Sequence, residues 1–165
     1  MYKRIAIVIC VLFLAGTLPL SHAGSYVIKG YTFTWHVISI GSAKMEIQKT
    51  PKGLQVILGS LGGVLATLSL APSQAKAIGE VLKKTEDYYE EQSKSDDRKS
   101  DDTIEADKCK VTFSSKQGRD FQIAIREAKI FSPEVLLSRS EAVVIGQYLR
   151  KAEKMAAFMD KRIQP

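Results

Sequence analysis

The sequence has few of the residues on which catalytic and metal sites depend. It holds two histidines, two cysteines and one tryptophan among 165 residues. A Ser–His–Asp or Cys–His centre would have to use His36, the one histidine beyond the first 23 residues. The alternation of its segment predicts that His36 is an exposed strand residue. No two histidines or cysteines have the spacing of a zinc site.

Phosphate and calcium motifs are missing as well. The segment "GSLGG", residues 59–63, lacks the lysine and the Ser/Thr of a phosphate-binding loop. The acids between Asp96 and Asp102 lack the alternate spacing and the glycine of a calcium loop. We therefore expect no metal and no cofactor, and we favour a non-enzymatic function over the alternative of an uncharacterised enzyme.

The N-terminus has the pattern of an export signal. Two basic residues precede an apolar run over residues 5–18, and Ser21 and Ala23 fit a small-residue cleavage site. The run is shorter than the roughly 20 residues that a membrane-spanning helix needs. We predict that residues 1–23 are a cleaved signal peptide and that the protein is exported, periplasmic or extracellular. The alternative is an uncleaved membrane anchor.

The two cysteines cannot pair within the exported chain, because Cys10 lies in the signal and Cys109 is left alone. Stability must then come from an apolar core. Cys109 alternates with Val111 and Phe113, which predicts a buried position. A reactive thiol or a disulfide to another chain is the alternative.

The sequence does contain an internal repeat. Residues 73–86 match residues 140–153 at an offset of 67, with seven identities in fourteen positions, whereas chance would give about one. Apolar residues recur at helical spacing in both stretches. Gly79 and Gly146 occupy the same place, and a mid-helix glycine costs about 1 kcal/mol relative to alanine. The shared glycine therefore predicts a close approach, to a sheet or to the twin helix.

Alternating segments precede both helices. The expected strands of the two halves are residues 43–47, 54–58 and 64–70, and residues 109–113, 121–125 and 134–137. Two further strands, 25–29 and 31–40, come first, and Gly62-Gly63 is typical of a hairpin tip. The sequence thus predicts an α+β fold, an internal duplication of a β-β-β-α unit with two extra N-terminal strands. Its antiparallel sheet or sheets are covered by two helices.

The repeat also sets the expected domain boundaries. The first repeat covers residues 24–92 and the second covers residues 107–165. The intervening residues 93–106 hold many acids and one strongly apolar side chain, Ile104. Such a segment buries too little to offset its ordering entropy, so we expect a flexible acidic linker.

Charge is distributed unevenly along the chain. The net charge is +6, with eleven acids against five bases in residues 80–107 and twelve bases against six acids in residues 108–165. A basic half can attract nucleic acid, acidic glycans or anionic lipid. The candidate residues for an anionic ligand are Lys110, Arg119, Arg126 and Lys129. The alternative is an ordinary soluble surface with scattered lysines.

The segment "KVTFSSKQGRDFQIAI", residues 110–125, followed by "VLLSRSEAVVIGQYLRKAEKM", residues 135–155, resembles a PUR-type repeat. In that family a strand, a basic glycine turn, an aromatic-led strand and a closing helix recur, and paired repeats bind single-stranded nucleic acid. The turn here departs from the family's Arg-Gly-Arg-Phe order, because Asp120 precedes Phe121. The resemblance implies a single-stranded nucleic-acid-binding protein as an alternative function.

A single-strand binder needs aromatic rings on the same exposed face as its cations. Alternation instead assigns Phe33, Trp35, Phe113 and Phe121 to the core. We therefore expect an exported, non-enzymatic interaction module that binds a protein or envelope partner through an open strand edge or a sheet face. Nucleic acid is the disfavoured partner.

Overall fold

The computed structural model describes residues 30–60 and 66–164. The predicted signal peptide, the predicted strand at residues 25–29 and the predicted Gly62-Gly63 tip lie outside the described residues. The rest forms an α+β fold of two antiparallel four-stranded sheets with helices, as predicted. No helix of the described segments combines the length and the apolar character needed to span a membrane.

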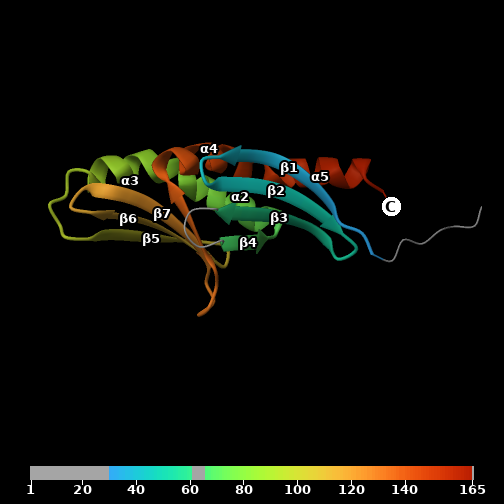
Figure 1. Ribbon diagram of the computed structural model, residues 1–165, viewed down its shortest axis with the longest axis horizontal. Helices are drawn as coiled ribbons and strands as arrows, with labels where there is room; N and C mark the ends of the chain where they lie inside the picture. Colours follow the sequence, from blue (N-terminus) through green and yellow to red (C-terminus); the bar gives the residue numbers. More distant parts are fainter. Residues whose placement is uncertain (1–29, 61–65, 165) are drawn as a thin grey trace, which may run out of the picture.

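The elements follow one another in the same order in both halves. The first sheet contains β1 (Phe33–Ile40), β2 (Ala43–Thr50), β3 (Gly53–Ser60) and β4 (Ala66–Leu70), and the second contains β5 (Ser100–Ala106), β6 (Cys109–Lys116), β7 (Arg119–Glu127) and β8 (Glu134–Ser138). The helices are α2 (Pro72–Val81), the 3-10 turn η1 (Leu82–Lys84), α3 (Thr85–Gln92), α4 (Arg139–Leu149) and α5 (Ala152–Arg162). The sheets lie side by side along the long axis, and the helices form a layer against them (Figure 1).

The repeated unit has four strands rather than three. β5 starts 67 residues after β1, and α4 starts 67 residues after α2. The segment expected to be an extra N-terminal strand, residues 31–40, is therefore β1, the first strand of the unit itself. The two similar sheets agree with an internal duplication.

The prediction of a flexible linker over residues 93–106 is wrong for its second half. Ser100–Ala106 is β5, which pairs with β6 along its whole length. β5 is an edge strand with acidic side chains on its exposed face, while Ile104 packs against the core and Ala106 is buried. Its composition therefore resembles that of a solvated segment, although its backbone belongs to the sheet. The boundary of the second half moves from residue 107 to Ser100.

The core lies between the sheets and the helices. Alternate residues of the strands face inward, and those of β2 and β6 are buried almost completely. Cys109 is one of them, which confirms the predicted position of the thiol. Burial, followed by the nearby Glu127 and Asp107 carboxylates, raises the pKa of Cys109. This thiol is therefore poorly reactive in the folded chain.

Each half relies on a helix of the other half to cover its sheet. α3 contacts β6, and Tyr88 stacks on Phe113 with ring centroids 4.5 Å apart. α5 contacts β2 and β3, and the ammonium of Lys49 donates to the backbone carbonyl of Asp160 at 3.2 Å. Because the C-terminal helices are exchanged in this way, the halves form one interlocked unit.

Two ion pairs that use equivalent glutamates join the halves across the helix layer. The carboxylate of Glu86 on α3 accepts hydrogen bonds from Arg139 on α4. Its counterpart 67 residues later, Glu153 on α5, lies 2.6 Å from the ammonium of Lys76 on α2. The hydrogen bond from Arg139 lowers the pKa of Glu86, and the one to Glu153 raises the pKa of Lys76. All four side chains are about half exposed, so each pair adds little to stability.

The helix starts also contact the opposite half. Ser138 caps α4 in a capping box, and its backbone N–H donates to Oε2 of Glu141 at 2.7 Å. The other carboxylate oxygen, Oε1, accepts from the backbone N–H of Ser42 at 2.6 Å, in the turn between β1 and β2. At the equivalent place on α2, Gln74 accepts from Ala71 N–H and donates to the carbonyl of Asp107, in the turn between β5 and β6.

Candidate partner-binding edge

Strand β1 is an open edge of the first sheet. Within the described residues it pairs with β2 alone, and its other side has no neighbouring strand. An edge of this kind presents backbone N–H and C=O groups to which a further strand can be added. Eight residues form the strand, which is long for an edge left uncovered.

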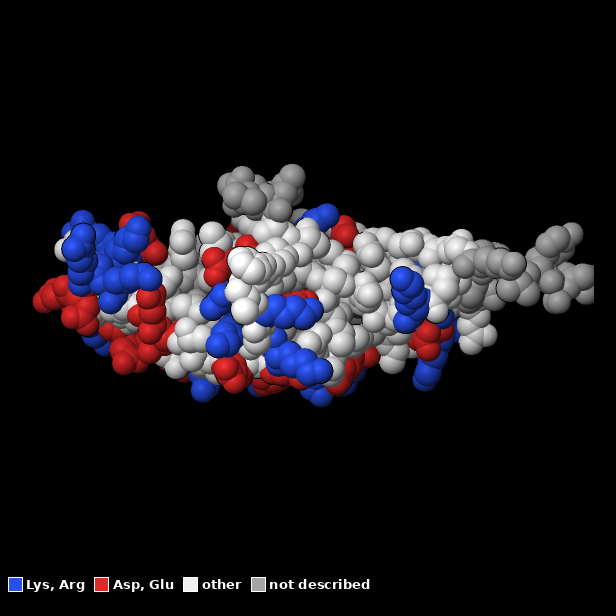
Figure 2. All heavy atoms as spheres, turned by 90° about the horizontal axis from the view of Figure 1, so that it is seen from below, with Lys and Arg blue, Asp and Glu red and all other residues white. Residues whose placement is uncertain are grey.

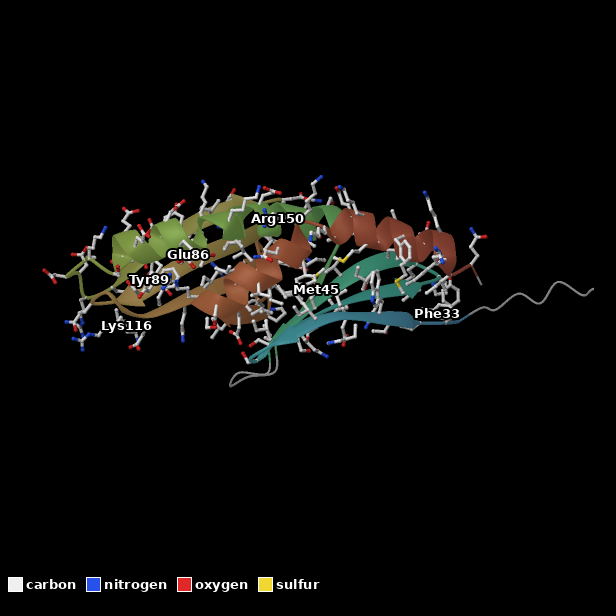
Figure 3. All side chains as sticks on the ribbon, turned by 90° about the horizontal axis from the view of Figure 1, so that it is seen from above. Phe33, Met45, Glu86, Tyr89, Lys116 and Arg150 are labelled. Atoms are coloured by element: carbon white, nitrogen blue, oxygen red, sulfur yellow. The ribbon has the colours of Figure 1, made fainter. Side chains whose placement is uncertain are left out.

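Aromatic rings line this edge. Phe33 and Trp35 remain 38% and 37% exposed, and Phe158 of α5 is 52% exposed. The Trp35 and Phe158 centroids lie 6.0 Å apart, and Tyr31 lies 5.3 Å from Phe33. Figure 3 labels Phe33 near the end of the molecule that α5 also reaches.

The sequence pattern accounts for this placement in part. Phe33 and Trp35 stand in register with Lys49 and Ile47, so they point to the helix side of the sheet as predicted. The prediction that they belong to the closed core is wrong, because β1 is the outermost strand and leaves them at the border of the core. Phe113 is fully buried, as predicted.

Phe158 was missed at the sequence level. The buried residues of α5 are Ala152, Ala156 and Met159. Phe158 lies off that stripe, and an aromatic ring on the polar side of an amphipathic helix is the signal that could have identified it.

Cations adjoin the rings. The last turn of α5 carries Lys161 and Arg162, and the Arg162 guanidinium lies 5.0 Å from the centroid of Phe158. The neighbouring acid, Asp160, is paired with Lys49 at 2.8 Å. Lys49 also donates to the carbonyl of Ile163, so it fixes the end of α5 against the sheet. The edge is therefore apolar and is bordered by the positive charges of α5. Lys49 fixes the end of this helix against the sheet.

A bulge limits the length of regular edge. The register between β1 and β2 shifts between His36 and Ile38. Bulges twist an edge strand and interrupt its pairing. The longer regular part is residues 33–36, which is also the aromatic part.

The same bulge brings His36 and Ser39 to one face of the sheet. Ser39 Oγ lies 3.2 Å from His36 Nε2, and His36 Nδ1 lies 3.8 Å from Oε1 of Glu46. The order is that of a Ser–His–acid relay, but 3.8 Å is too long for the hydrogen bond that would orient the imidazole. His36 is exposed, as predicted, and it lines neither of two clefts of about 650 and 790 Å³ on the described surface. We assign no catalytic role to this group.

Three of the four residues predicted to bind an anion come together. Lys110, Arg126 and Lys129 line a hollow of about 180 Å³ at one end of the second sheet. Arg119 begins the same strand seven residues before Arg126, about 23 Å away at the usual rise per residue. The structure therefore does not bring Arg119 into this group.

Each cation of the hollow has an acid beside it. Lys110 lies 3.6 Å from Glu105, Lys129 lies 2.6 Å from Glu127, and Arg126 is in register with Glu134. The hydrogen bond and charge of Glu127 raise the pKa of Lys129. The same mixture is visible on the face drawn in Figure 2, where Lys and Arg stand among Asp and Glu. Because these acids offset the cations, the hollow has little net attraction for an anion.

Two exposed apolar residues come directly after Lys129 in the sequence, and the first of them also lines the hollow. Ile130 and Phe131 are 87% and 97% exposed in the connection between β7 and β8. Neither residue was predicted to be exposed, although two large apolar residues directly before Ser-Pro do not fit an alternating strand. Among the described residues no cluster of three or more His, Cys, Asp or Glu side chains is arranged to hold a metal ion.

Comparisons with known proteins give no assignment. No protein-family model matches the sequence, and no curated protein matches it. Twelve solved chains match in structure. One is described as "Crystal structures of trypanosoma bruciei MRP1/MRP2". It has 9% sequence identity over 94% of this chain and 96% of that chain, with a TM-score of 0.32.

Proposed function

We propose that the protein is an exported, non-enzymatic interaction module that binds an extended segment of a protein partner along β1. The observation that carries this proposal is the open, aromatic-lined edge over residues 33–36. In strand addition, backbone hydrogen bonds give affinity, and pockets for alternate side chains give specificity. Here the alternate side chains of the added strand would meet Phe33, Trp35 and Phe158.

The single tryptophan makes the proposal testable. Trp35 is the only tryptophan of the chain, so its emission reports on this edge alone. Peptides are selected from a random displayed library on the immobilised protein, and the best is synthesised and titrated. We expect alternating apolar and polar residues in the selected peptides, and a shift of Trp35 emission to shorter wavelength as the ring leaves water.

Matched phenylalanine variants locate the binding. Phe33→Ala and Phe158→Ala are expected to weaken peptide binding at least about tenfold, because each removes a large apolar contact. Phe131→Ala, at a more exposed ring in another place, is the control and is expected to leave affinity unchanged. Peptide binding that leaves Trp35 emission and the Phe33→Ala affinity unaltered would contradict the proposal.

Single-stranded nucleic acid is the second candidate for the same edge. The favouring observation is that rings and cations occur together there, since Arg162 covers Phe158 and Lys161 follows Asp160. Stacking of bases on such rings is the usual mode of single-strand binding. A fluorescent oligonucleotide titrated at two salt concentrations tests it. The logarithm of the binding constant should fall with the logarithm of the salt concentration, with a slope of about −0.7 per phosphate contact.

The two candidates predict different results. For the peptide-binding module, oligonucleotide affinity at about 150 mM salt is no tighter than roughly micromolar, the range of non-specific binding. Submicromolar affinity that Arg162→Ala weakens would instead support the nucleic-acid reading. Replacing Arg119 and Arg126, the two arginines predicted from sequence, separates binding at this edge from binding at the second sheet.

Export is part of the proposal and has its own test. It is supported by the basic start, the apolar run over residues 5–18 and the small residues Ser21 and Ala23. Intact-mass measurement of the protein from the producing cell is expected to show a chain that begins at Gly24. A full-length mass in the membrane fraction would contradict it.

A further inference from the structure

The connection between β7 and β8 carries the two most exposed large apolar side chains of the described residues, Ile130 and Phe131. We call this pair the apolar tip. Figure 1 shows the connection, in orange, projecting beyond both sheets on the side away from the helices. Two adjacent large apolar side chains are unfavourable in water. Apolar groups exposed together in this way indicate a surface that a partner covers.

The base of this connection is held by hydrogen bonds. The backbone N–H of Ala128 donates to the carbonyl of Lys108 at 2.8 Å, in the turn between β5 and β6. The Ser132 hydroxyl donates to the carbonyl of Glu127 at 2.9 Å, which links the two sides of the connection. Pro133 follows, and its ring fixes the backbone angle φ. The apolar tip is therefore held out from the sheet before a partner binds, so that binding costs little ordering entropy.

The apolar tip and the outer face of the second sheet form one surface. The inward side chains of β6 and β7, such as Val111 and Ile125, are buried between the sheet and the helices. Lys110 and Arg126 directly precede or follow these residues, so they point to the opposite face. Ile130 lines a hollow together with Lys110 and Arg126, which places the tip on that outer side.

A row of four charged residues crosses the outer face beside the tip. The register of the strands places them opposite one another, in the order Glu105, Lys110, Arg126 and Glu134. The turn between β5 and β6 adds one acid and one base, Asp107 and Lys108. Lys129, next to the tip, is paired with Glu127. The surface around the apolar tip thus carries both signs of charge and has no net charge.

We propose that the apolar tip inserts into the surface of a zwitterionic lipid bilayer. The headgroups of such a bilayer carry a phosphate and an ammonium group, which a neutral surface with both signs of charge complements. A fluid lipid surface admits a projecting pair of side chains, whereas a protein partner would need a pocket shaped for them. The long stems of Lys110 and Arg126 can lie along the apolar region while their charged ends stay in water. The site is separate from the β1 edge and does not depend on the function proposed there.

Flotation with vesicles of palmitoyl-oleoyl phosphatidylcholine tests the proposal. The chain that begins at Gly24 is used, because the apolar run over residues 5–18 could itself bind lipid. This chain contains all described residues and therefore the whole described core. We expect reversible binding with a partition constant on the order of 10³–10⁴ M⁻¹, no stronger than that of one myristoyl chain. Such a constant leaves most of the protein bound at roughly 10 mM lipid, so absence of binding there overturns the proposal.

Matched alanine variants locate the contact. Phe131→Ala and Ile130→Ala are expected to weaken vesicle binding at least about tenfold. Both should leave the melting temperature unchanged, because neither side chain is buried. Phe158→Ala removes an exposed ring of α5 and is the control, expected to weaken peptide binding at β1 and to leave vesicle binding unchanged. The two proposals can therefore fail independently. Vesicle binding that neither tip variant weakens overturns this one.

Fluorescence and lipid charge separate insertion from other contacts. In the double variant Phe131→Trp, Trp35→Phe, emission is expected to move to shorter wavelength with vesicles, as the new ring leaves water. Adding phosphatidylglycerol to about a third of the lipid should change the partition constant less than about threefold, because the surface has no net charge. Binding that requires phosphatidylglycerol overturns the proposal. So does a dimer of the free protein that Phe131→Ala abolishes, since a second copy would then cover the tip.

Discussion

Gly79 of α2 and Gly146 of α4 face each other where the two helices cross. A Cβ built on Gly79 would lie 3.0 Å from the carbonyl oxygen of Gly146 and 2.6 Å from the backbone nitrogen of Arg150. A Cβ on Gly146 would lie 2.9 Å from Cβ of Leu82. The close approach predicted from the repeated glycine is confirmed, and the neighbour is the twin helix.

Gly79→Ala is therefore expected to destabilise the protein by about 1–3 kcal/mol, the usual range for overpacking. The loss should occur although alanine favours a helix by about 1 kcal/mol over glycine, because the nearest atoms are backbone and cannot rotate away. Urea unfolding measures it. Gly30→Ala is the control, since no atom lies within 4 Å of the added Cβ. An unchanged or raised stability in Gly79→Ala would mean that the helices separate easily.

Periodicity predicted those parts of the fold in which one face is buried. The strands β2, β3, β6 and β7 alternate clearly, and their predicted positions agree with the structure. β5 was missed because an edge strand buries few side chains and its exposed face carries acids. The exchange of α3 and α5 between the sheets could not be predicted, because it depends on the angle at which the helices cross and on the breaks that follow Gly79 and Gly146.

Leu82 and Leu149 occupy equivalent core positions and offer a second test of the duplication. Both are fully buried, 67 residues apart. Replacing either by alanine is expected to cost about 2–5 kcal/mol, as for other buried leucines. Leu136→Ala, at a more exposed leucine, is the control and is expected to have a small effect. The measurement is the midpoint of urea unfolding. The dependence of the unfolding free energy on urea concentration is expected to stay unchanged. A near-zero cost at one of the two positions would show that the halves are not equivalent.

Glu141 is expected to make stability depend on pH. Burial opposes its ionisation, but hydrogen bonds from Ser138 and Ser42 outweigh burial and lower the pKa of Glu141. A group with a lowered folded-state pKa contributes stability above its unfolded pKa, about 4.3. That stability is lost as the pH falls through the folded value.

Glu141→Gln is accordingly expected to cost about 1–3 kcal/mol at pH 7, as for other hydrogen bonds to a charged group. The difference from the unchanged protein should shrink as the pH falls below about 4.3. Thermal unfolding across this range measures it. Glu105→Gln, at an exposed carboxylate, is the control. A difference that stays constant with pH would show that the carboxylate charge is not what joins α4 to the turn after β1.

The candidate sites were harder to predict than the fold, for a physical reason. The sequence prediction grouped Lys110, Arg119, Arg126 and Lys129 by charge, yet Arg119 lies at the opposite end of β7 from Arg126, and each remaining cation has an acid beside it. The edge rings Phe33 and Trp35 were recognised as inward-facing. Their exposure depends on β1 being outermost, which alternation within one strand cannot reveal.

The interlocked helices predict that the two halves stay together when the connection between them is cut. Residues 93–99 join α3 to β5 and are largely exposed, and exposed connections are preferred sites of proteolysis. A specific protease site inserted after Arg98 would leave both sheets intact. We expect the nicked protein to elute as one particle, because α3 remains packed on β6 and α5 on β2 and β3.

The first half produced alone is expected to lack a cooperative unfolding transition, since α5 is missing from its sheet. Denaturant should separate the nicked halves and serves as the control. If the halves separate under native conditions and each unfolds cooperatively, the helix exchange does not hold the molecule together.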